Sequence, residues 1–195
     1  MRFVHVPKTG GVAVHAFLKD KPMFNLFQRA HHVTVCHVRE QSLIVIRDPV
    51  DRFVSQYNFW RHGSDFAACK NAEDNGFTIR DYIEFIKSGD TEHLDRKFTG
   101  ELHYAPQTRW ITPNTYRNTI VIIYDAEKLA QKVYDVLDSL GCPYEKNFPV
   151  KNVTAHKDSV VLEPEDLEWI RDHYAADFEL LRLLHECPEK FRAVH

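Results

Sequence analysis

Two short segments of the chain, 42–46 and 119–124, are almost continuously apolar. Uninterrupted apolar runs of this length are typical of strands that are buried on both faces of a parallel sheet. A strand-like run over 2–6 and a β-branched segment over 33–38 are two further strand candidates. The apolar pattern therefore predicts a small sheet whose inner strands have no solvent-exposed face.

Between these runs, apolar residues recur at the spacing of an α-helix. Helices are predicted at 12–19, 49–60, 78–87, 125–140 and 164–185, with Ala175 as a candidate break in the last. Thr78 is a good N-cap for the third helix, and Pro49 suits the first position of the second. Gly89 and Gly141 are stop signals for the third and the fourth.

Strands that alternate with helices along the chain predict an α/β fold. Right-handed crossovers would give three layers, a mainly parallel central sheet with helices on both faces. The chain has 195 residues and contains neither an internal repeat nor a linker. We therefore expect a single domain over residues 1–195.

Composition excludes several classes of function. Acidic residues number 28 and basic residues 25, which gives a formal net charge of −3 and argues against a nucleic-acid partner. No stretch approaches the roughly 20 apolar residues of a membrane span, and no signal peptide is visible. The four cysteines lack a CxxC pair, which disfavours a disulfide framework or a zinc knuckle. A cytoplasmic protein without a membrane anchor is the expectation.

The first candidate site is the loop Pro7-Lys8-Thr9-Gly10-Gly11, between a predicted strand and a predicted helix. Glycines let backbone amides approach an anion closely, and the helix that follows presents free N–H groups. Lys8 adds a full positive charge. The loop lacks the Walker A pattern, and its alternative interpretation is an ordinary turn between strand and helix.

The second candidate site follows the strand 42–46. Arg47 lies at its carboxyl end, where open α/β sheets bind ligands, and a guanidinium suits a phosphate. Ser55, about two turns into the next helix, offers a hydroxyl to the same anion. The alternative is that Arg47 pairs with Asp48 or Asp51 and that Ser55 lies on a solvated face.

In combination, PKTGG and RDPxxRxxSxY resemble the sulfotransferases that use 3′-phosphoadenosine-5′-phosphosulfate (PAPS). The resemblance is to carbohydrate sulfotransferases such as the heparan sulfate 2-O-sulfotransferases. It implies a fold like that of the P-loop nucleotide-binding proteins, with PAPS as donor and adenosine 3′,5′-bisphosphate (PAP) as product. It also implies that residues 7–11 hold the 5′-phosphosulfate, and that Arg47 and Ser55 hold the 3′-phosphate.

Further segments are similar to the same family. HYAPQ at 103–107 resembles its H-W-x-P-Q segment, and residues 123–129 and 173–178 resemble a strand-to-helix junction and a closing Y-x-x-D-[FY] helix. One departure concerns Val12 and Ala13, which stand where the family usually has Thr or Ser. A hydroxyl contact to the 5′-phosphate is therefore expected to be missing.

Sulfuryl transfer needs a stabilised leaving group and a base for the acceptor hydroxyl. Lys8 is the candidate for the first role, and no metal is required. For the base, AHHV resembles the family's H-x-H-V segment, which points to His32 as the catalytic histidine. His31 and His37 remain open as alternatives, and a zinc site formed by these three histidines is a further alternative.

The acceptor is expected to be a hydroxyl compound, most simply a carbohydrate. Aromatic and polar side chains that could line its cleft are Trp60, Arg61, His103, Tyr104, Arg109 and Trp110. The alternative for the aromatic residues in this set is burial in the core. Lys157 is a candidate for closing the cofactor site, as a basic residue often does in the family; the alternative is an ordinary solvated lysine. The alternatives are a nucleotide-dependent small-molecule kinase and a non-catalytic binder of nucleotides or glycans, and the sequence assigns no oligomeric state.

Overall fold

The computed structural model describes residues 1–24, 41–62, 72, 74–90, 103–111, 118–149, 160–188 and 193–194. The chain divides into two compact units. The first comprises Met1–Asp48, Gln107–Asn152 and Ala176–His195, and the second Pro49–Pro106 and Val153–Ala175. The single domain expected over residues 1–195 stays a prediction.

A parallel sheet is the centre of the first unit. In the described residues its strands are β1 (Arg2–Val4), β2 (Ser42–Ile46), β3 (Thr119–Ile123) and β4 (Ala193–Val194), in that spatial order. All three pairings are parallel; Val4 is opposite Ile44, and Ile46 is opposite Ile123. All five residues of β2 are buried, as its apolar sequence predicts.

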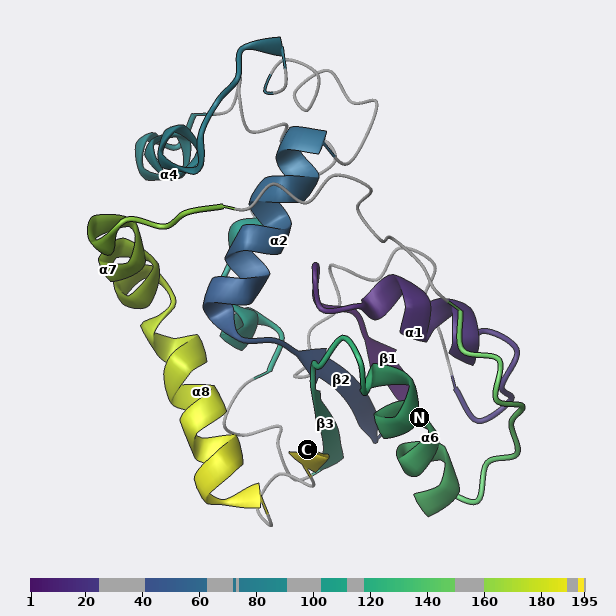
Figure 1. The fold of residues 1–195 in the computed structure, drawn as a ribbon. Coiled ribbons are helices and arrows are strands. Elements are labelled where there is room, and N and C mark those ends of the chain that lie inside the picture. Colours follow the sequence, from purple (N-terminus) through teal and green to yellow (C-terminus); the bar gives the residue numbers. More distant parts are fainter. Residues whose placement is uncertain are drawn as a thin grey trace. The chain divides into compact units, whose positions relative to one another are not determined.

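Helices cover both faces of this sheet. Those of the first unit are α1 (Gly11–Leu18), α6 (Leu129–Ser139) and α8 (Ala175–Glu186). Figure 1 shows α1 and α6 on one side of the sheet and α8 on the other. Leu43 and Val45 join the core beneath α1 and α6, whereas Ile44 and Ile46 point to the opposite face and are also buried. The predicted three-layer α/β fold is confirmed.

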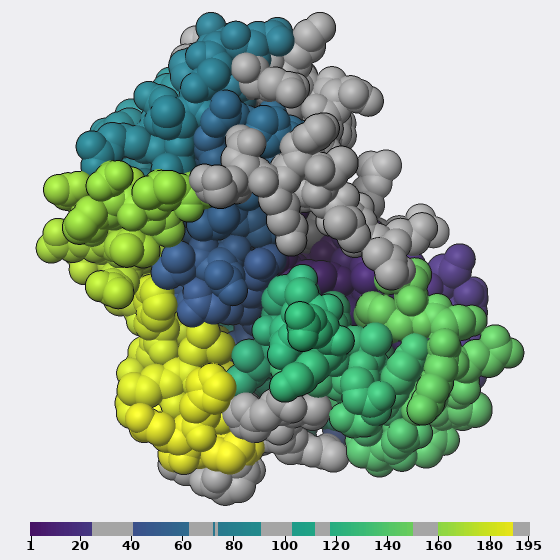
Figure 2. Space-filling view, in the orientation of Figure 1, coloured from purple at the N-terminus to yellow at the C-terminus, as the bar shows by residue number. Residues whose placement is uncertain are grey.

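Aromatic rings join α1, α6 and the segment that follows α6. Tyr134 stacks on Tyr144 at 4.9 Å between ring centroids, and Phe17 packs against Phe148 at 5.2 Å. The space-filling view shows this segment, in light green, next to the purple of α1 (Figure 2). These contacts complete the core on the α1 and α6 side of the sheet.

The second unit contains α2 (Pro49–His62), α4 (Ile79–Ser88) and α7 (Pro164–His173). Phe53 of α2 lies 5.6 Å from Tyr82 and 5.7 Å from Trp169, measured between ring centroids. Tyr57 and Trp60 continue the same buried face of α2. Three aromatic residues at helical spacing therefore form the core of this unit.

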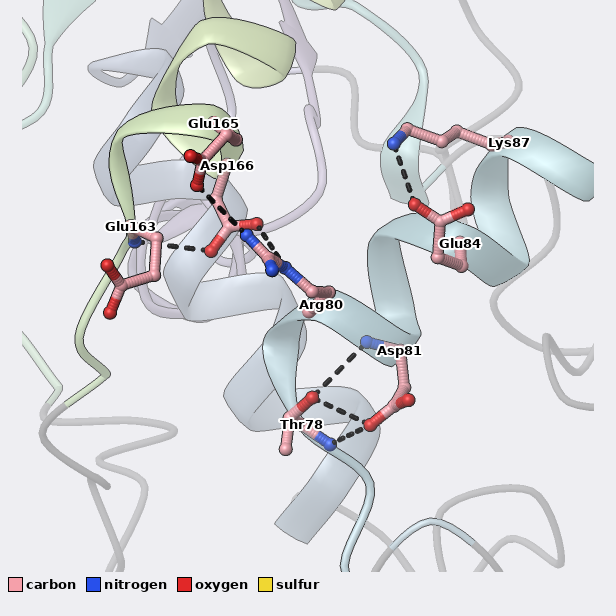
Figure 3. Close-up of polar contacts among 8 residues, drawn as sticks. All are labelled: Thr78, Arg80, Asp81, Glu84, Lys87, Glu163, Glu165 and Asp166. Atoms are coloured by element: carbon pink, nitrogen blue, oxygen red, sulfur yellow. Dashed lines mark hydrogen bonds and ion pairs between the residues drawn. The ribbon is translucent and has the colours of Figure 1, made fainter.

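Polar contacts at the surface of this unit join α4 to the start of α7 (Figure 3). Arg80 donates to Asp166 at 3.3 Å and to Glu165 at 3.2 Å. Thr78 and Asp81 form a reciprocal capping box at the start of α4. The start of α4 is therefore held both by its own cap and by carboxylates of α7.

Most element boundaries agree with the sequence. The Thr78 cap, the stop at Gly89 with φ of 66°, and the break between α7 and α8 are confirmed. Two boundaries were predicted incorrectly: β1 ends at Val4, and α6 begins at Leu129 instead of residue 125. The predicted strand over 33–38 lies outside the described residues.

Candidate active site

The loop between β1 and α1 has an uncommon backbone conformation. Lys8 has φ of 65° and Gly10 has φ of 77°, both in the left-handed region. This region disfavours side chains other than glycine, and residues held there are concentrated at functional sites. The buried Thr9 hydroxyl donates to the carbonyl of Val6 at 2.9 Å, which closes the turn. The loop is thus fixed by internal contacts.

Gly10 and Gly11 are both sites of close approach. A Cβ atom at Gly10 would lie 2.7 Å from Leu129 Cδ2 and 2.9 Å from Tyr124 Cε2. A Cβ atom at Gly11 would lie 2.0 Å from Cδ2 of the His5 ring. Both glycines are therefore required by side chains that pack on the loop, a requirement that the sequence alone does not reveal.

The N-terminus of α1 faces this loop without an acidic neighbour. The amides of Ala13 and Val14 bond to the carbonyl of Gly10, at 3.0 and 3.3 Å. The N–H groups of Gly11 and Val12 come before the first of these bonds, so they have no acceptor within the helix. The first turn contains no acidic residue, and no side chain caps it. Helix ends of this kind favour anions through both their donors and their dipole.

Arg47 directly follows β2 and reaches the same loop. Its Nη1 donates to the carbonyl oxygen of Lys8 at 3.4 Å, and its Cζ lies 4.6 Å from the centroid of the Tyr124 ring. Its Nε is buried and has no hydrogen-bond acceptor among the described residues. The two anion sites inferred from the sequence are thus brought together, through Lys8 and Arg47.

The main chain of Arg47 is bound by the side chain of Gln107. The Arg47 N–H donates to Gln107 Oε1 at 2.8 Å, and Gln107 Nε2 donates to the Arg47 carbonyl at 2.7 Å. Gln107 lies in the short 3₁₀ helix η3 (Gln107–Arg109), and its side chain is fully buried. The position of Arg47 is therefore determined at its backbone as well as at its guanidinium.

The electrostatics of the loop favour an anion. Burial, and to a lesser extent the positive charge of Arg47, lower the pKa of Lys8 from 10.5 to about 8. An anion bound between the two cations would stabilise the charged form of Lys8. A strongly perturbed lysine within a phosphate-type loop is a feature of functional sites.

The remaining predicted catalytic and cofactor-binding residues lie in the second unit or outside the described residues. Ser55 lies on α2, in the second unit, with its side chain partly buried. His32 and Lys157 fall outside the described residues, as do the alternatives His31 and His37. The cofactor roles of Pro7, Thr9 and the other predicted residues stay predictions.

The tryptophans expected to line an acceptor cleft are core residues instead. Trp60 is 2% exposed and lies 4.8 Å from Tyr82 between ring centroids, within the second unit. Trp110 of the first unit is fully buried. Their large apolar surfaces are better satisfied by burial than by a binding face, which corrects the interpretation of these two residues.

Comparison with known proteins decides the family. The model described as the sulfotransferase family matches residues 3–183. The chain belongs to the sulfotransferase family. The match begins in β1, ends in α8 and includes both the Lys8 loop and Arg47. Neither the curated proteins nor the solved structures gave a match to this sulfotransferase.

Membership of this family assigns the chain to the transferases of sulfuryl groups. Among the residues described for this sulfotransferase, no helix has both the length and the apolar character needed to cross a bilayer. Tyr124 and Gln107 contact Arg47, and Asp177 contacts Gln107, but the sequence pattern assigned none of these three residues a role. The only signal for them was their place in segments that resemble the family.

Proposed function

We propose that this sulfotransferase moves the sulfuryl group of PAPS to a hydroxyl group of a carbohydrate. The observation that carries the proposal is the meeting of Lys8 and Arg47 at one edge of the sheet, where a carbonyl of one accepts from the guanidinium of the other. Two cations held together beside a helix N-terminus favour a ligand with several negative charges.

The residues of the loop fit a phosphate group by their chemistry. The orphaned Nε–H of Arg47 and the amides at the start of α1 are donors, and an anion would provide acceptors for them. Lys8 would neutralise charge on the 5′ side, and Arg47 would bind the 3′-phosphate. Ser55 and Lys157 are proposed to add a hydroxyl and a further positive charge.

In the proposed reaction the chain's own groups orient the substrates and move a proton. PAPS, when bound, supplies a sulfuryl group that is activated by its link to a phosphate. Lys8 and the loop amides would stabilise the charge that develops on the departing phosphate oxygen. His32 would accept the proton of the acceptor hydroxyl, since a neutral imidazole is a suitable base near pH 7. None of these roles requires a metal ion.

Calorimetric titration of PAP, 5′-AMP and ATP tests the donor site. We expect PAP to bind about 10- to 100-fold more tightly than 5′-AMP, because a charge-assisted contact to the 3′-phosphate contributes roughly 1.5–3 kcal/mol. Arg47→Ala should remove most of this difference. Arg182→Ala, which changes an exposed arginine paired with Glu179, is the control that should preserve it.

Equal affinity for PAP and 5′-AMP in the unmodified protein would contradict the assignment of the 3′-phosphate to Arg47. Tighter binding of ATP than of PAP would favour a nucleotide-dependent kinase.

A further inference from the structure

We propose that Gln107 and Asp177 are positioning residues that hold Arg47 in place for recognition of the 3′-phosphate. The inference rests on the proposed function, because it takes Arg47 as the 3′-phosphate ligand. Gln107 contacts the main chain of Arg47, and Asp177 contacts the main chain of Gln107. Neither residue is proposed to contact the phosphate itself. What they determine is the place of the strand end from which Arg47 projects.

Gln107 supplies hydrogen-bonding partners for Arg47 at a level of the sheet that β1 no longer reaches. The carbonyl of Ile46 accepts from the amide of Tyr124, toward β3, at 2.7 Å. Along a strand, the N–H and C=O groups of successive residues point to opposite sides. The N–H and C=O of Arg47 therefore face the β1 side. β1 has already ended at Val4, opposite Ile44. The amide of Gln107 therefore takes the place of a neighbouring peptide group.

Asp177 in turn holds Gln107. Its two carboxylate oxygens accept the backbone N–H of Gln107 at 2.7 Å and that of Thr108 at 2.9 Å. Asp177 and Gln107 are both fully buried. Hydrogen bonds to a buried carboxylate are stronger than those between neutral groups, so this end of η3 is firmly attached to α8.

The contacts form a continuous chain from α8 to the guanidinium. Asp177 fixes the backbone of Gln107, the Gln107 side chain fixes the backbone of Arg47, and Tyr124 supports its guanidinium at 4.6 Å. Without Gln107, the part-buried N–H and C=O of Arg47 would lose these partners, and the strand end would be free to move. A displaced Arg47 would lose the 3′-phosphate, while the Lys8 loop would retain the 5′ group.

The ratio of PAP affinity to 5′-AMP affinity tests this inference. In Gln107→Met, which keeps the length of the side chain and removes both hydrogen bonds, we expect the ratio to fall at least about tenfold. Asp177→Asn, which leaves one oxygen to accept two N–H groups, should lower it in the same direction. Binding of 5′-AMP should change less than about threefold, because its contacts are to the loop.

The matched controls are buried residues of the same types in the second unit. Gln56 is 1% exposed and donates to Tyr82, and Asp166 is 5% exposed and caps α7. Gln56→Met and Asp166→Asn are expected to lower the thermal midpoint while the affinity ratio stays unchanged. A general loss of stability is thereby separated from a loss of positioning. Gln107→Leu, which also removes both hydrogen bonds without adding a buried charge, is the second variant if Gln107→Met does not fold.

Two results have different meanings. If the unmodified protein does not distinguish PAP from 5′-AMP, the proposed function fails, and the positioning role fails with it. The second result is that the unmodified protein prefers PAP to 5′-AMP and that Arg47→Ala loses this preference. If the Gln107 and Asp177 variants then keep the full affinity ratio, only the positioning role is overturned.

Discussion

Lys8 is held in a backbone conformation and an environment that both disfavour it. Its φ of 65° lies in the left-handed region, and burial beside Arg47 lowers its pKa to about 8. Each feature destabilises the protein in the absence of an anion. Both are explained if the residue is shaped for a ligand that carries negative charge.

The lowered pKa of Lys8 predicts a pH dependence of PAP binding. Below pH 8 the ammonium is present, and above pH 8 it is lost from the free protein. The Kd for PAP should therefore rise by about tenfold from pH 7 to pH 9, following the fraction of protonated lysine. Isothermal titration at several pH values measures this change.

Lys8→Arg is the control for this pH dependence, since a guanidinium stays charged over the whole range. Its Kd should be flat between pH 7 and pH 9. A Kd for the unmodified protein that does not change over this range would show that Lys8 is not a PAP ligand or that its pKa is not lowered.

His32 is the residue for which we predict a separation of turnover from binding. His32→Ala should reduce turnover by roughly 10²–10⁴, the usual contribution of a positioned base, and leave the Kd for PAP nearly unchanged. In the unmodified protein the rate should rise with pH through an inflection at about pH 6–7, which the variant should lack. Steady-state kinetics from pH 5.5 to pH 8 provide the measurement.

His31→Ala and His37→Ala are the matched variants for this prediction. Both should retain turnover and the inflection. Loss of turnover in either of them, together with unchanged turnover in His32→Ala, would assign the base to a different histidine.

Sequence and structure differ in what they reveal about single residues. The roles proposed for Lys8 and Arg47 rest on local patterns, because a cation beside a glycine-rich loop or after a buried strand can be recognised from the sequence. Those proposed for Gln107 and Asp177 could not be inferred in this way, because their partners lie 60 and 70 residues away along the chain. For Trp110 the sequence suggested a place in a binding surface, but the side chain is fully buried in the core.

Among the elements, helices with strong local signals were predicted best. α4 begins after the Thr78 cap and ends at Gly89 as expected. The start of α6 was missed because the carboxylate of Asp125 accepts the N–H groups of Glu127 and Lys128, at 3.0 and 3.3 Å. These bonds hold a turn before the helix, and such a side-chain competition with the backbone is hard to infer from periodicity.

The junction of the loop with α1 provides a prediction at the level of an element. In Gly11→Ala the new Cβ would overlap the His5 ring, at 2.0 Å from Cδ2, so the ring must leave its stack on Phe3. We expect a loss of about 1–3 kcal/mol in the free energy of unfolding, measured by urea denaturation.

The double variant His5→Ala with Gly11→Ala distinguishes this overlap from other causes. Relative to His5→Ala alone, it should be no less stable, and up to about 1 kcal/mol more stable, because alanine favours a helix. The explanation by steric overlap is wrong if Gly11→Ala destabilises both backgrounds equally.

At the scale of the whole molecule, the order of the strands assembles the site. β1 and β2 are parallel neighbours, so the loop after one and the arginine after the other emerge at the same edge of the sheet. The α/β class followed from the alternation of strands and helices, and the family match over residues 3–183 agrees with it. The division into two compact units could not be predicted, because α2 follows β2 without any linker.

The most direct measurement of the central claim is transfer of radiolabelled sulfate from PAPS to a panel of carbohydrates by the purified chain. We predict that label enters a carbohydrate with release of one PAP per sulfate transferred, and that Lys8→Ala and His32→Ala reduce both. The account would be contradicted if PAPS binds but no carbohydrate becomes labelled, whether sulfate passes to a non-carbohydrate hydroxyl or is not transferred at all.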